Sequence, residues 1–536
     1  MKKLALLLLV SLCLGSLGGC VHYGQFRNDT LKKPVPPQAS PTPFKLCNDD
    51  PNVDPAHKSI WCPEGKSKYY LGFVEVDDFG EMFDRRQLTH VQQLIQKAKA
   101  DSPTVDGNCS PTHNALVVVF IHGWKNNASD GSGNVWGFRD ELNDIAGALP
   151  EVTPKCQGQK QPDQKEGPMP VVGIYIGWRG QVTNLGLASQ LTFYNRQDAA
   201  IRLPGAHLTE ALYEIMNETK SCLGSCKETT SPGTGSVAVI VGHSFGGQVL
   251  ERTMTQAVAA RVLDEVAEKK RVEARGEKWT GGNLPLPVDL IVLVNEAAPA
   301  TESRQLLDLL RHYQFRLCAE ADPNPDSNRC KENRPLFLSI TSTGDWATGL
   351  ALPIAQGGSS LIRRNFQTYH NPKCTDPEHK GPKCKEPDPR DVPIPGQRTW
   401  YLHTSAHLPP LFSHVLGPAD DPKIKQWVDD ANQHGRGADV HLFCIGKDNP
   451  KDAEECAKEN GKEYAIAPLL GVYNDTPYWI MQMGTEFVPD HSQIFRPAFR
   501  QLLKQFVLRR LDITQPGTPV KPAIMQIGPR APAPSQ

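Results

Sequence analysis

Short apolar runs alternate along the chain with segments whose apolar residues recur every three or four positions. The runs are rich in Val, Ile and Leu, and they predict buried strands at 115–121, 170–176, 236–241, 288–294 and 336–341. The segments around them predict amphipathic helices, with apolar faces such as Leu88, Val91, Leu94, Ile95 and Ala98. Strand, helix and strand repeated at this spacing predict an α/β fold with a mostly parallel, doubly wound sheet.

The same pattern bounds one long body between two ends of different composition. We expect the body at about residues 47–513, interrupted at about 355–464 by Pro-, Lys- and Cys-rich sequence that we interpret as an insertion over one end of the sheet. Pro residues are frequent from 34 to 43, so residues 20–46 are predicted to be an extended tether that lets the body stand off a membrane. Residues 514–536 are Pro-rich without periodicity and are predicted to be a disordered tail.

The first residues have the pattern of an export signal. Two Lys residues precede an apolar run at 4–14, which is too short to span a bilayer, and the tetrapeptide LGGC then ends at Cys20. We therefore interpret residues 1–19 as a signal peptide. The tetrapeptide resembles the lipobox of bacterial lipoproteins, which implies an acylated Cys20 and a lipid-anchored protein of the cell envelope. Val21 favours the outer membrane by analogy with lipoprotein sorting. The alternative is a secreted protein cleaved nearby.

Cysteine usage agrees with export. Of the 14 Cys residues, those other than Cys13 and Cys20 form an even set available for disulfides in an oxidising compartment. Pairing in chain order would join Cys47 with Cys62, Cys109 with Cys156, Cys222 with Cys226, Cys318 with Cys330, Cys374 with Cys384, and Cys444 with Cys456. Sequence alone does not fix this connectivity. The spacing of Cys222 and Cys226 leaves a metal site as the alternative there.

Charge and motifs exclude several classes of function. Lys+Arg 58 and Asp+Glu 59 give a formal net charge of -1, so no global positive field attracts a polyanion, and nucleic acid is not an expected partner. No GxxxxGK[ST], GxGxxG or HExxH motif occurs, so we expect no cofactor and no metal. His403, His407 and His414 are spaced in a way that hints at metal ligands. Two Pro residues interrupt the helix that such ligands would share, so we favour a wall of a pocket.

The candidate chemistry begins where the run at 236–241 ends. The hexapeptide GHSFGG follows at 242–247 and precedes a predicted helix. A strand-to-helix elbow of this kind holds its nucleophile in a strained backbone conformation, and the flanking Gly residues avoid clashes there. It would present the Oγ of Ser244 at the carboxyl edge of the sheet. The alternative is a Gly-rich turn with an inert Ser.

A second loop can complete an acyl-transfer site. His122, Gly123 and Trp124 follow the run at 115–121, a position from which a backbone N–H can face the serine and bind a developing oxyanion. We expect His122 itself to support the loop rather than to transfer protons.

These motifs resemble the α/β-hydrolase superfamily, and within it the bacterial members with an HG(Y/F/W)xN oxyanion loop. The matching stretches are FIHGWKNNA, IGWRG after the next strand, and YNRQDAA at the start of a helix, and the resemblance covers about residues 69–508. It implies an α/β-hydrolase fold in which the amides of Trp124 and Phe245 bind the oxyanion. It also implies that the acid and then the base follow the nucleophile along the chain.

Asp345 and His491 are the expected acid and base. Asp345 closely follows the run at 336–341, and His491 lies between a strand-like run at 478–483 and a helix rich in Phe and Leu. The alternatives are an N-cap role for Asp345, Glu296 as the acid one strand earlier, and a capping or surface role for His491.

Together these residues predict a serine hydrolase of the cell envelope that cleaves an ester through an acyl-enzyme on Ser244. His491, oriented by Asp345, would remove the proton of Ser244. The expected partners are a small-molecule or lipid ester and the membrane that holds the anchor. One alternative is a non-catalytic envelope protein that kept the fold for binding or scaffolding. Another is an acyltransferase that uses the same serine with an alcohol acceptor.

Overall fold

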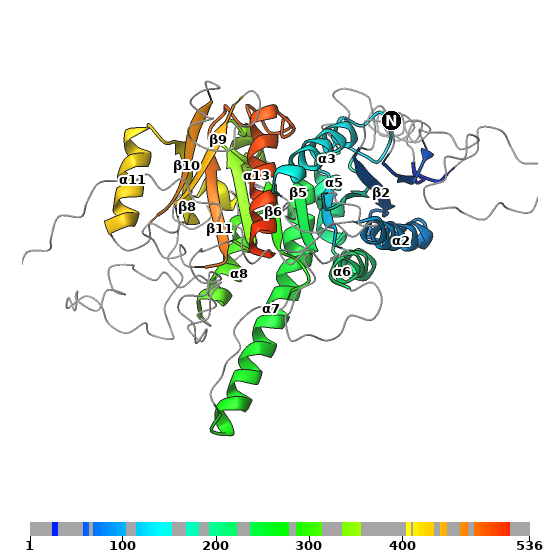
Figure 1. Cartoon of the computed structure of the whole chain (residues 1–536), viewed down its shortest axis with the longest axis horizontal. Coiled ribbons are helices and arrows are strands. Elements are labelled where there is room, and N and C mark those ends of the chain that lie inside the picture. The colour runs from blue at the N-terminus through cyan, green and yellow to red at the C-terminus, as the bar shows by residue number, and fades with distance from the viewer. Residues whose placement is uncertain are drawn as a thin grey trace, which may run out of the picture.

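The computed structural model describes residues 24–29, 57–63, 68–102, 114–152, 168–181, 192–221, 236–277, 286–312, 335–354, 404–408, 411–433, 440–446, 461–469 and 476–514. Its strands are β1 (Ile60–Trp61), β2 (Tyr69–Glu75), β3 (Leu116–Ile121), β4 (Val171–Gly177), β5 (Val237–His243), β6 (Leu290–Val294), β7 (Phe337–Ser342), β8 (His414–Pro418), β9 (His441–Ile445), β10 (Lys462–Pro468) and β11 (Tyr478–Met483). Its α-helices are α2 (Arg85–Asp101), α3 (Gly133–Val152), α5 (Phe193–Arg202), α6 (Ala206–Lys220), α7 (Phe245–Ala274), α8 (Ala300–His312), α11 (Pro422–Gln433) and α13 (Pro497–Thr514). Figure 1 shows these helices arranged around the sheet.

The strands form one sheet that is parallel across its centre. Its order is β1-β2-β4-β3-β5-β6-β7-β11-β8-β10-β9. All neighbours from β2 to β8 are parallel, whereas β1, β10 and β9 pair antiparallel at the two ends. The strands from β2 to β7 are buried along their whole length, which suits their continuous apolar sequences. The predicted α/β class with a mostly parallel sheet is confirmed.

Successive strand residues enter two separate cores, because their side chains point to opposite faces of the sheet. In β3, Val117 and Val119 share one hydrophobic cluster with residues of α2, α6, α7 and α8. Val118 and Phe120 share the other cluster with residues of α3 and α13. Helix α7 has 30 residues, and its buried residues end at Val262, so its second half extends beyond the core (Figure 1).

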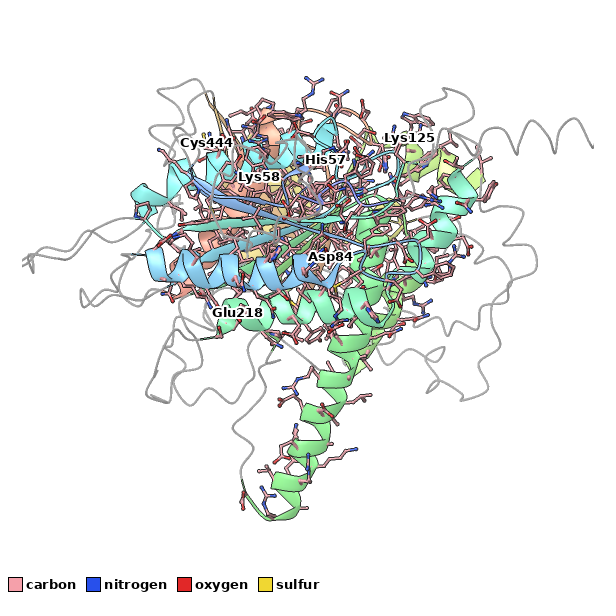
Figure 2. The ribbon with its side chains drawn as sticks, turned by 90° about the vertical axis from the view of Figure 1, so that its right-hand side faces the viewer. His57, Lys58, Asp84, Lys125, Glu218 and Cys444 are labelled. Carbon is pink, nitrogen blue, oxygen red and sulfur yellow. The ribbon has the colours of Figure 1, made fainter. Side chains whose placement is uncertain are left out.

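The C-terminal ends of the central strands meet at one edge of the sheet, which we call the carboxyl edge. Ser244 directly follows β5, Asp345 follows β7, and His491 lies in the loop after β11. Figure 2 shows the same edge from the side: the labelled residue Lys125, which follows β3, lies toward the right of the view.

The sequence pattern missed the strands at both ends of the sheet. β1 and β2 precede the first predicted strand. β8 and β9 lie within residues 355–464, where an insertion was expected, and β10 begins there and ends at Pro468. These three strands instead continue the sheet beyond β11, with α11 packed beside β8 and β10. β8 and β9 have five residues each and are only partly buried, so they lack the continuous apolar run of a central strand.

Residues 24–29 pack against the body, where the sequence predicted a tether. The amides of Phe26 and Arg27 donate to the two carboxylate oxygens of Glu75 at 2.9 and 2.7 Å. The guanidinium of Arg27 lies 4.2 Å from the centroid of the Phe73 ring, and its Nε donates to the carbonyl of Ala128 at 2.7 Å. Arg27 is buried by these contacts.

The two ends of the stretch between residues 29 and 57 are also held together. The amide of Asp29 donates to the carbonyl of His57 at 3.0 Å, and the carboxylate of Asp29 accepts from the amide and hydroxyl of Ser59 at 2.9 and 2.6 Å. Asp29 and His57, which flank the stretch that contains the Pro residues, therefore lie side by side. Residues 24–29 therefore do not form an extended tether, and the rest of the predicted tether, with its Pro residues, lies outside the described ranges.

Several sequence predictions fall on residues outside the described ranges. These are the signal peptide, Cys20, the tail from residue 515 and most of the predicted disulfides. Cys62 and Cys444 are each disulfide-bonded, but the partners expected from chain order, Cys47 and Cys456, lie outside the described ranges. None of the helices that the structure describes is long and apolar enough to cross a membrane.

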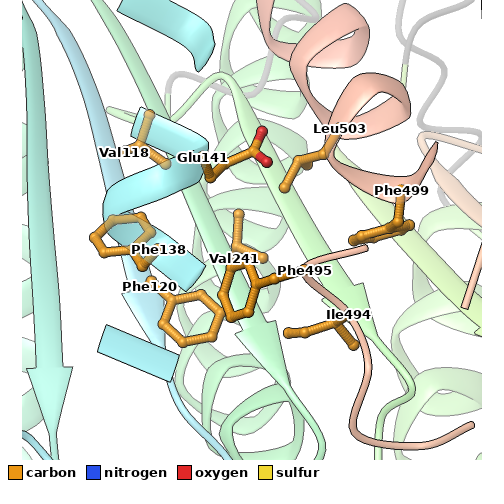
Figure 3. Close-up of a pocket in the computed structure, with 9 residues that line it drawn as sticks. All are labelled: Val118, Phe120, Phe138, Glu141, Val241, Ile494, Phe495, Phe499 and Leu503. Carbon is orange, nitrogen blue, oxygen red and sulfur yellow. The ribbon is translucent and has the colours of Figure 1, made fainter. Parts of the chain in front are cut away.

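A small apolar cavity lies between α3, α13 and the sheet, with Glu141 in its wall (Figure 3). Neither carboxylate oxygen of Glu141 has a hydrogen-bond partner among the described residues. Burial, and secondarily the charge of Asp144, raises the pKa of Glu141 well above its ordinary value, although Arg500 and Lys504 oppose the shift. The native state therefore favours the neutral acid at this position.

Candidate active site

Ser244 occupies a strained turn between β5 and α7. Its φ is 58° and its ψ is -123°, a region that residues with a side chain rarely adopt. The amide of Ser244 donates to the carbonyl of Val294 at 3.0 Å, and its carbonyl accepts from the amide of Ala297 at 3.1 Å. Strand β6 and the loop after it therefore hold the turn in this conformation, with Ser244 at the carboxyl edge.

Two Gly residues allow the loop after β3 to touch this turn. A Cβ added at Gly123 would lie 2.6 Å from the Cβ and 3.2 Å from the Oγ of Ser244. A Cβ added at Gly246 would lie 2.2 Å from the carbonyl oxygen of Ile121. Side chains at these positions would push the loop away from Ser244. The contact therefore requires Gly at both positions, and it brings Trp124, the next residue in the loop, toward the nucleophile.

The backbone amides of Trp124 and Phe245 donate no hydrogen bond to any described residue. Phe245 is the first residue of α7, where amides have no partner within the helix and the helix dipole adds positive potential. The ring of Phe193, at the start of α5, lies 5.4 Å from the rings of both residues. These aromatic contacts hold Trp124 and Phe245 in place relative to each other. The sequence predicted these two residues as oxyanion donors.

His491 bridges Ser244 and Asp345. Its Nε2 lies 2.7 Å from Ser244 Oγ, and its Nδ1 lies 2.9 Å from Asp345 Oδ1. An ionised carboxylate can only accept, so Nδ1 carries the proton and Nε2 accepts from the serine hydroxyl. The structure thus brings the predicted nucleophile, base and acid into one hydrogen-bonded chain, although they come from three separate loops.

Asp345 is held as a carboxylate by several donors. Burial would raise the pKa of Asp345, but hydrogen bonds from His491 and Thr348 outweigh burial and place this pKa below its ordinary value. The amide of Thr348 donates to Oδ1 at 3.1 Å, and its hydroxyl donates to Oδ2. Asp345 therefore caps the first turn of the following helical segment as well as orienting His491. Asp345 thus makes both the hydrogen bond of the N-cap alternative and the contact with His491 that the predicted acid role requires.

Two residues that the sequence left without a role hold the backbone of His491. His243 Nε2 and Asn295 Nδ2 both donate to the carbonyl oxygen of His491, at 2.9 and 3.0 Å. Burial, with the nearby His491, lowers the pKa of His243 to about 3, so this ring stays neutral. Asn295 has a φ of 45°, which Asn tolerates better than most residues, and its Oδ1 accepts from the amide of Ser342 at 3.0 Å. The sequence signals were an Asn directly after a strand and a His beside the serine.

His122 supports the oxyanion loop through Trp178. Its Nε2 accepts from the amide of Trp178 at 3.0 Å, and the indole N–H of Trp178 donates to the carbonyl of His122 at 2.7 Å. The two rings are stacked with 6° between their planes. Burial lowers the pKa of His122 to about 4. His122 is therefore neutral, and both of its ring nitrogens take part in hydrogen bonds. Trp178 is the Trp of the IGWRG stretch.

Glu296, the alternative acid, packs against α7 instead of His491. Its carboxyl hydrogen-bonds to that of Glu251, which also accepts from the hydroxyl of Tyr478. Burial and the charge of Glu251 raise the pKa of Glu296 well above its ordinary value. A group that favours its neutral form is unsuited to stabilise an imidazolium, so the geometry favours Asp345.

The His residues at 403–414 lie in different environments. His407 Nε2 is 3.0 Å from Thr348 Oγ1, and the ring of His414 stacks on Trp479 with centroids 3.8 Å apart. His403 lies outside the described ranges. Within those ranges, no group of three or more His, Cys, Asp or Glu side chains is arranged to hold a metal ion. His407 instead contacts the residue that hydrogen-bonds Asp345.

Comparisons with known proteins assign no family to this site. No family model, curated protein or solved structure matches the chain. The fold and the geometry around Ser244 are therefore the basis for a function.

Proposed function

We propose that the protein is a serine hydrolase with an α/β-hydrolase fold, which cleaves esters through an acyl-enzyme on Ser244. The observation that carries the proposal is the hydrogen-bonded chain from Ser244 through His491 to Asp345, with distances of 2.7 and 2.9 Å. A strained serine between a central strand and a helix supports the fold assignment, as does the chain order of serine, acid and histidine.

In the proposed reaction, His491 Nε2 takes the proton of Ser244 as Oγ attacks the acyl carbon. The resulting imidazolium gives that proton to the leaving alcohol, and a water molecule, activated by the same His491, then releases the acid and restores Ser244. Asp345 stabilises the imidazolium. The amides of Trp124 and Phe245 donate to the oxyanion, and each such donor contributes about 3 kcal/mol to the transition state.

Turnover of a short-chain p-nitrophenyl ester tests the proposal. Ser244→Ala and His491→Ala are each expected to lower kcat by about 10⁴-fold or more, because an unassisted serine is a poor nucleophile. Ser221→Ala at the end of α6 and His207→Ala near its start are the matched controls and should keep the wild-type rate. Full activity in Ser244→Ala would refute the proposal. Adding a soluble alcohol and measuring free acid against new ester separates hydrolysis from acyl transfer.

We also propose that the mature chain begins at an acylated Cys20 in the bacterial cell envelope. The charged start, the short apolar run and the LGGC tetrapeptide support this anchor. Mass spectrometry of the N-terminal peptide from membrane-extracted protein should find an acylated Cys20, and an unmodified or differently cleaved terminus would contradict it.

A further inference from the structure

The carboxyl edge carries large apolar side chains that are open to solvent. Trp346, Leu350 and Ile354 are 65%, 59% and 70% exposed, and Tyr194 is 61% exposed. We call the following set the apolar rim: Phe79, Phe83, Tyr194, Trp346, Leu350 and Ile354. Scattered single apolar residues are normal on a protein surface, whereas a group of them around a candidate site marks an interaction surface.

One side of the rim is a helical segment that starts directly after Asp345. Thr348 and Leu352 turn into the body, both with 1% exposure. Trp346, Leu350 and Ile354 alternate with them on the outer face. A helix on a protein surface usually presents polar residues to water, but the outer face of this segment is apolar. This face begins one residue from the acid that orients His491.

The other side of the rim lies across the nucleophile. The ring of Tyr194 is 5.5 Å from that of Phe193, which in turn contacts Trp124 and Phe245. Phe79 and Phe83 follow β2 at the same edge. In the sheet, β5 with Ser244 lies between β2 and β7, so the rim extends to both sides of the serine.

The docked N-terminal segment brings the proposed lipid anchor to this edge. Gly24 and Phe83 line the same shallow hollow, together with Trp178. The buried contacts of Arg27 with Ala128 and Glu75 fix the segment there. The four residues from Cys20 to Gly24 span at most about 14 Å when fully extended. An acylated Cys20 would therefore keep the rim near the bilayer surface.

We propose that the apolar rim lies on the bilayer that holds the acyl chains of Cys20, and that Ser244 acts on an ester of a lipid in that bilayer. This inference rests on the proposed hydrolase function and on the proposed anchor. Trp and Tyr suit the boundary between headgroups and acyl chains, and Leu, Ile and Phe gain from leaving water. Helix α7 starts at the carboxyl edge and extends away from it, so it leaves this face unobstructed (Figures 1 and 2).

Partition of activity between a bilayer and water tests the inference. The mature acylated chain is reconstituted in vesicles of phosphatidylethanolamine and phosphatidylglycerol. Its turnover of p-nitrophenyl palmitate in the vesicles is divided by its turnover of soluble p-nitrophenyl acetate. The double variant Leu350→Ser and Ile354→Ser should lower this ratio by about tenfold or more, because two apolar side chains no longer leave water. Leu263→Ser, an exposed position on α7, is the matched control and should keep the ratio. An unchanged ratio in the double variant would overturn the inference.

Fluorescence quenching tests the docking surface without catalysis. Brominated phospholipids quench only Trp residues that reach the bilayer. Trp346→Phe should remove most of the quenchable signal, whereas Trp427→Phe, on α11, should retain it. Equal quenching in both variants and the wild type would refute docking through the rim. If Trp346 is quenched but no ester is hydrolysed, the proposed function fails and the docking surface stands.

Discussion

Replacing Asp345 with Asn isolates the role of its charge. Oδ1 of Asp345 faces two donors, the Nδ1 of His491 at 2.9 Å and the amide of Thr348 at 3.1 Å. In Asp345→Asn, the side-chain oxygen should take the position of Oδ1, because an amide nitrogen there would face two donors and could accept from neither. The amide nitrogen would then face the Thr348 hydroxyl, which can turn and accept. The substitution therefore removes the charge while His491 keeps its orientation and tautomer.

The size of the effect follows from the distance between the charges. Asp345 is 1% exposed, so its interaction with protonated His491 is screened less than a surface pair would be. Two unit charges about 4 Å apart interact by about 4 kcal/mol at an effective dielectric constant of about 20. That energy stabilises the imidazolium formed in the transition state, and its loss corresponds to about a thousandfold fall in kcat.

Steady-state kinetics of ester hydrolysis measures this fall. Asp345→Asn should retain its substrate KM within a small factor and lose kcat by about a thousandfold. Glu296→Gln is the matched control, because Gln resembles the neutral acid that the buried site favours, and it should keep the wild-type kcat. A fall of less than about tenfold in Asp345→Asn would refute the reasoning. So would an equal fall in Glu296→Gln.

Three further changes have outcomes that follow from the structure. Gly123→Ala places a methyl group 2.6 Å from the Cβ of Ser244, so kcat should fall by about 100-fold with the circular dichroism spectrum retained, and a wild-type kcat would contradict the described contact. Glu141→Leu should raise the free energy of unfolding by about 1–3 kcal/mol at neutral pH. Folding raises the pKa of Glu141 above its ordinary value of 4.5. When the pH rises past 4.5, the unfolded chain therefore releases a proton that the native state keeps. The free energy of unfolding falls as a result. The increase in the free energy of unfolding of Glu141→Leu, measured with urea, should therefore be larger at neutral pH than in acid. An equal increase at both pH values would count against a buried neutral Glu141. Arg27→Ala should speed proteolytic cleavage near Phe26, since it removes the contacts that dock residues 24–29, and an unchanged rate of cleavage would show that the docking does not depend on Arg27.

The proposed nucleophile and the proposed oxyanion loop could be located from the sequence because each is a short contiguous motif at the end of an apolar run. Ser244 and Trp124 needed only a strand before them and Gly beside them. Asp345 and His491 needed more, because their loops are 146 residues apart in the chain and meet only where β7 pairs with β11. The order of serine, acid and histidine that the resemblance implies supplied that information. It did not supply the residues that hold the pair in place.

The residues that the sequence missed act through backbone atoms or through shared hydrogen bonds. His243 and Asn295 hold the carbonyl of His491, which no local pattern reveals. The docking of residues 24–29 was missed for a related reason. A polar residue such as Arg27 is normally exposed, and only its contacts with Glu75 and Phe73 show that it is buried here. Hydrophobic periodicity is insensitive to elements that are held by polar contacts.

Reaction with a fluorophosphonate tests the central claim most directly, because the reagent phosphonylates only a serine that a neighbouring base activates. The mature protein with its disulfides intact is treated with the probe, and digested peptides are sequenced by mass spectrometry. The account predicts a phosphonyl group on Ser244 in the peptide that contains residues 242–247, and no adduct in Ser244→Ala or His491→Ala. An unlabelled wild-type protein, or an adduct that persists in His491→Ala, would contradict it.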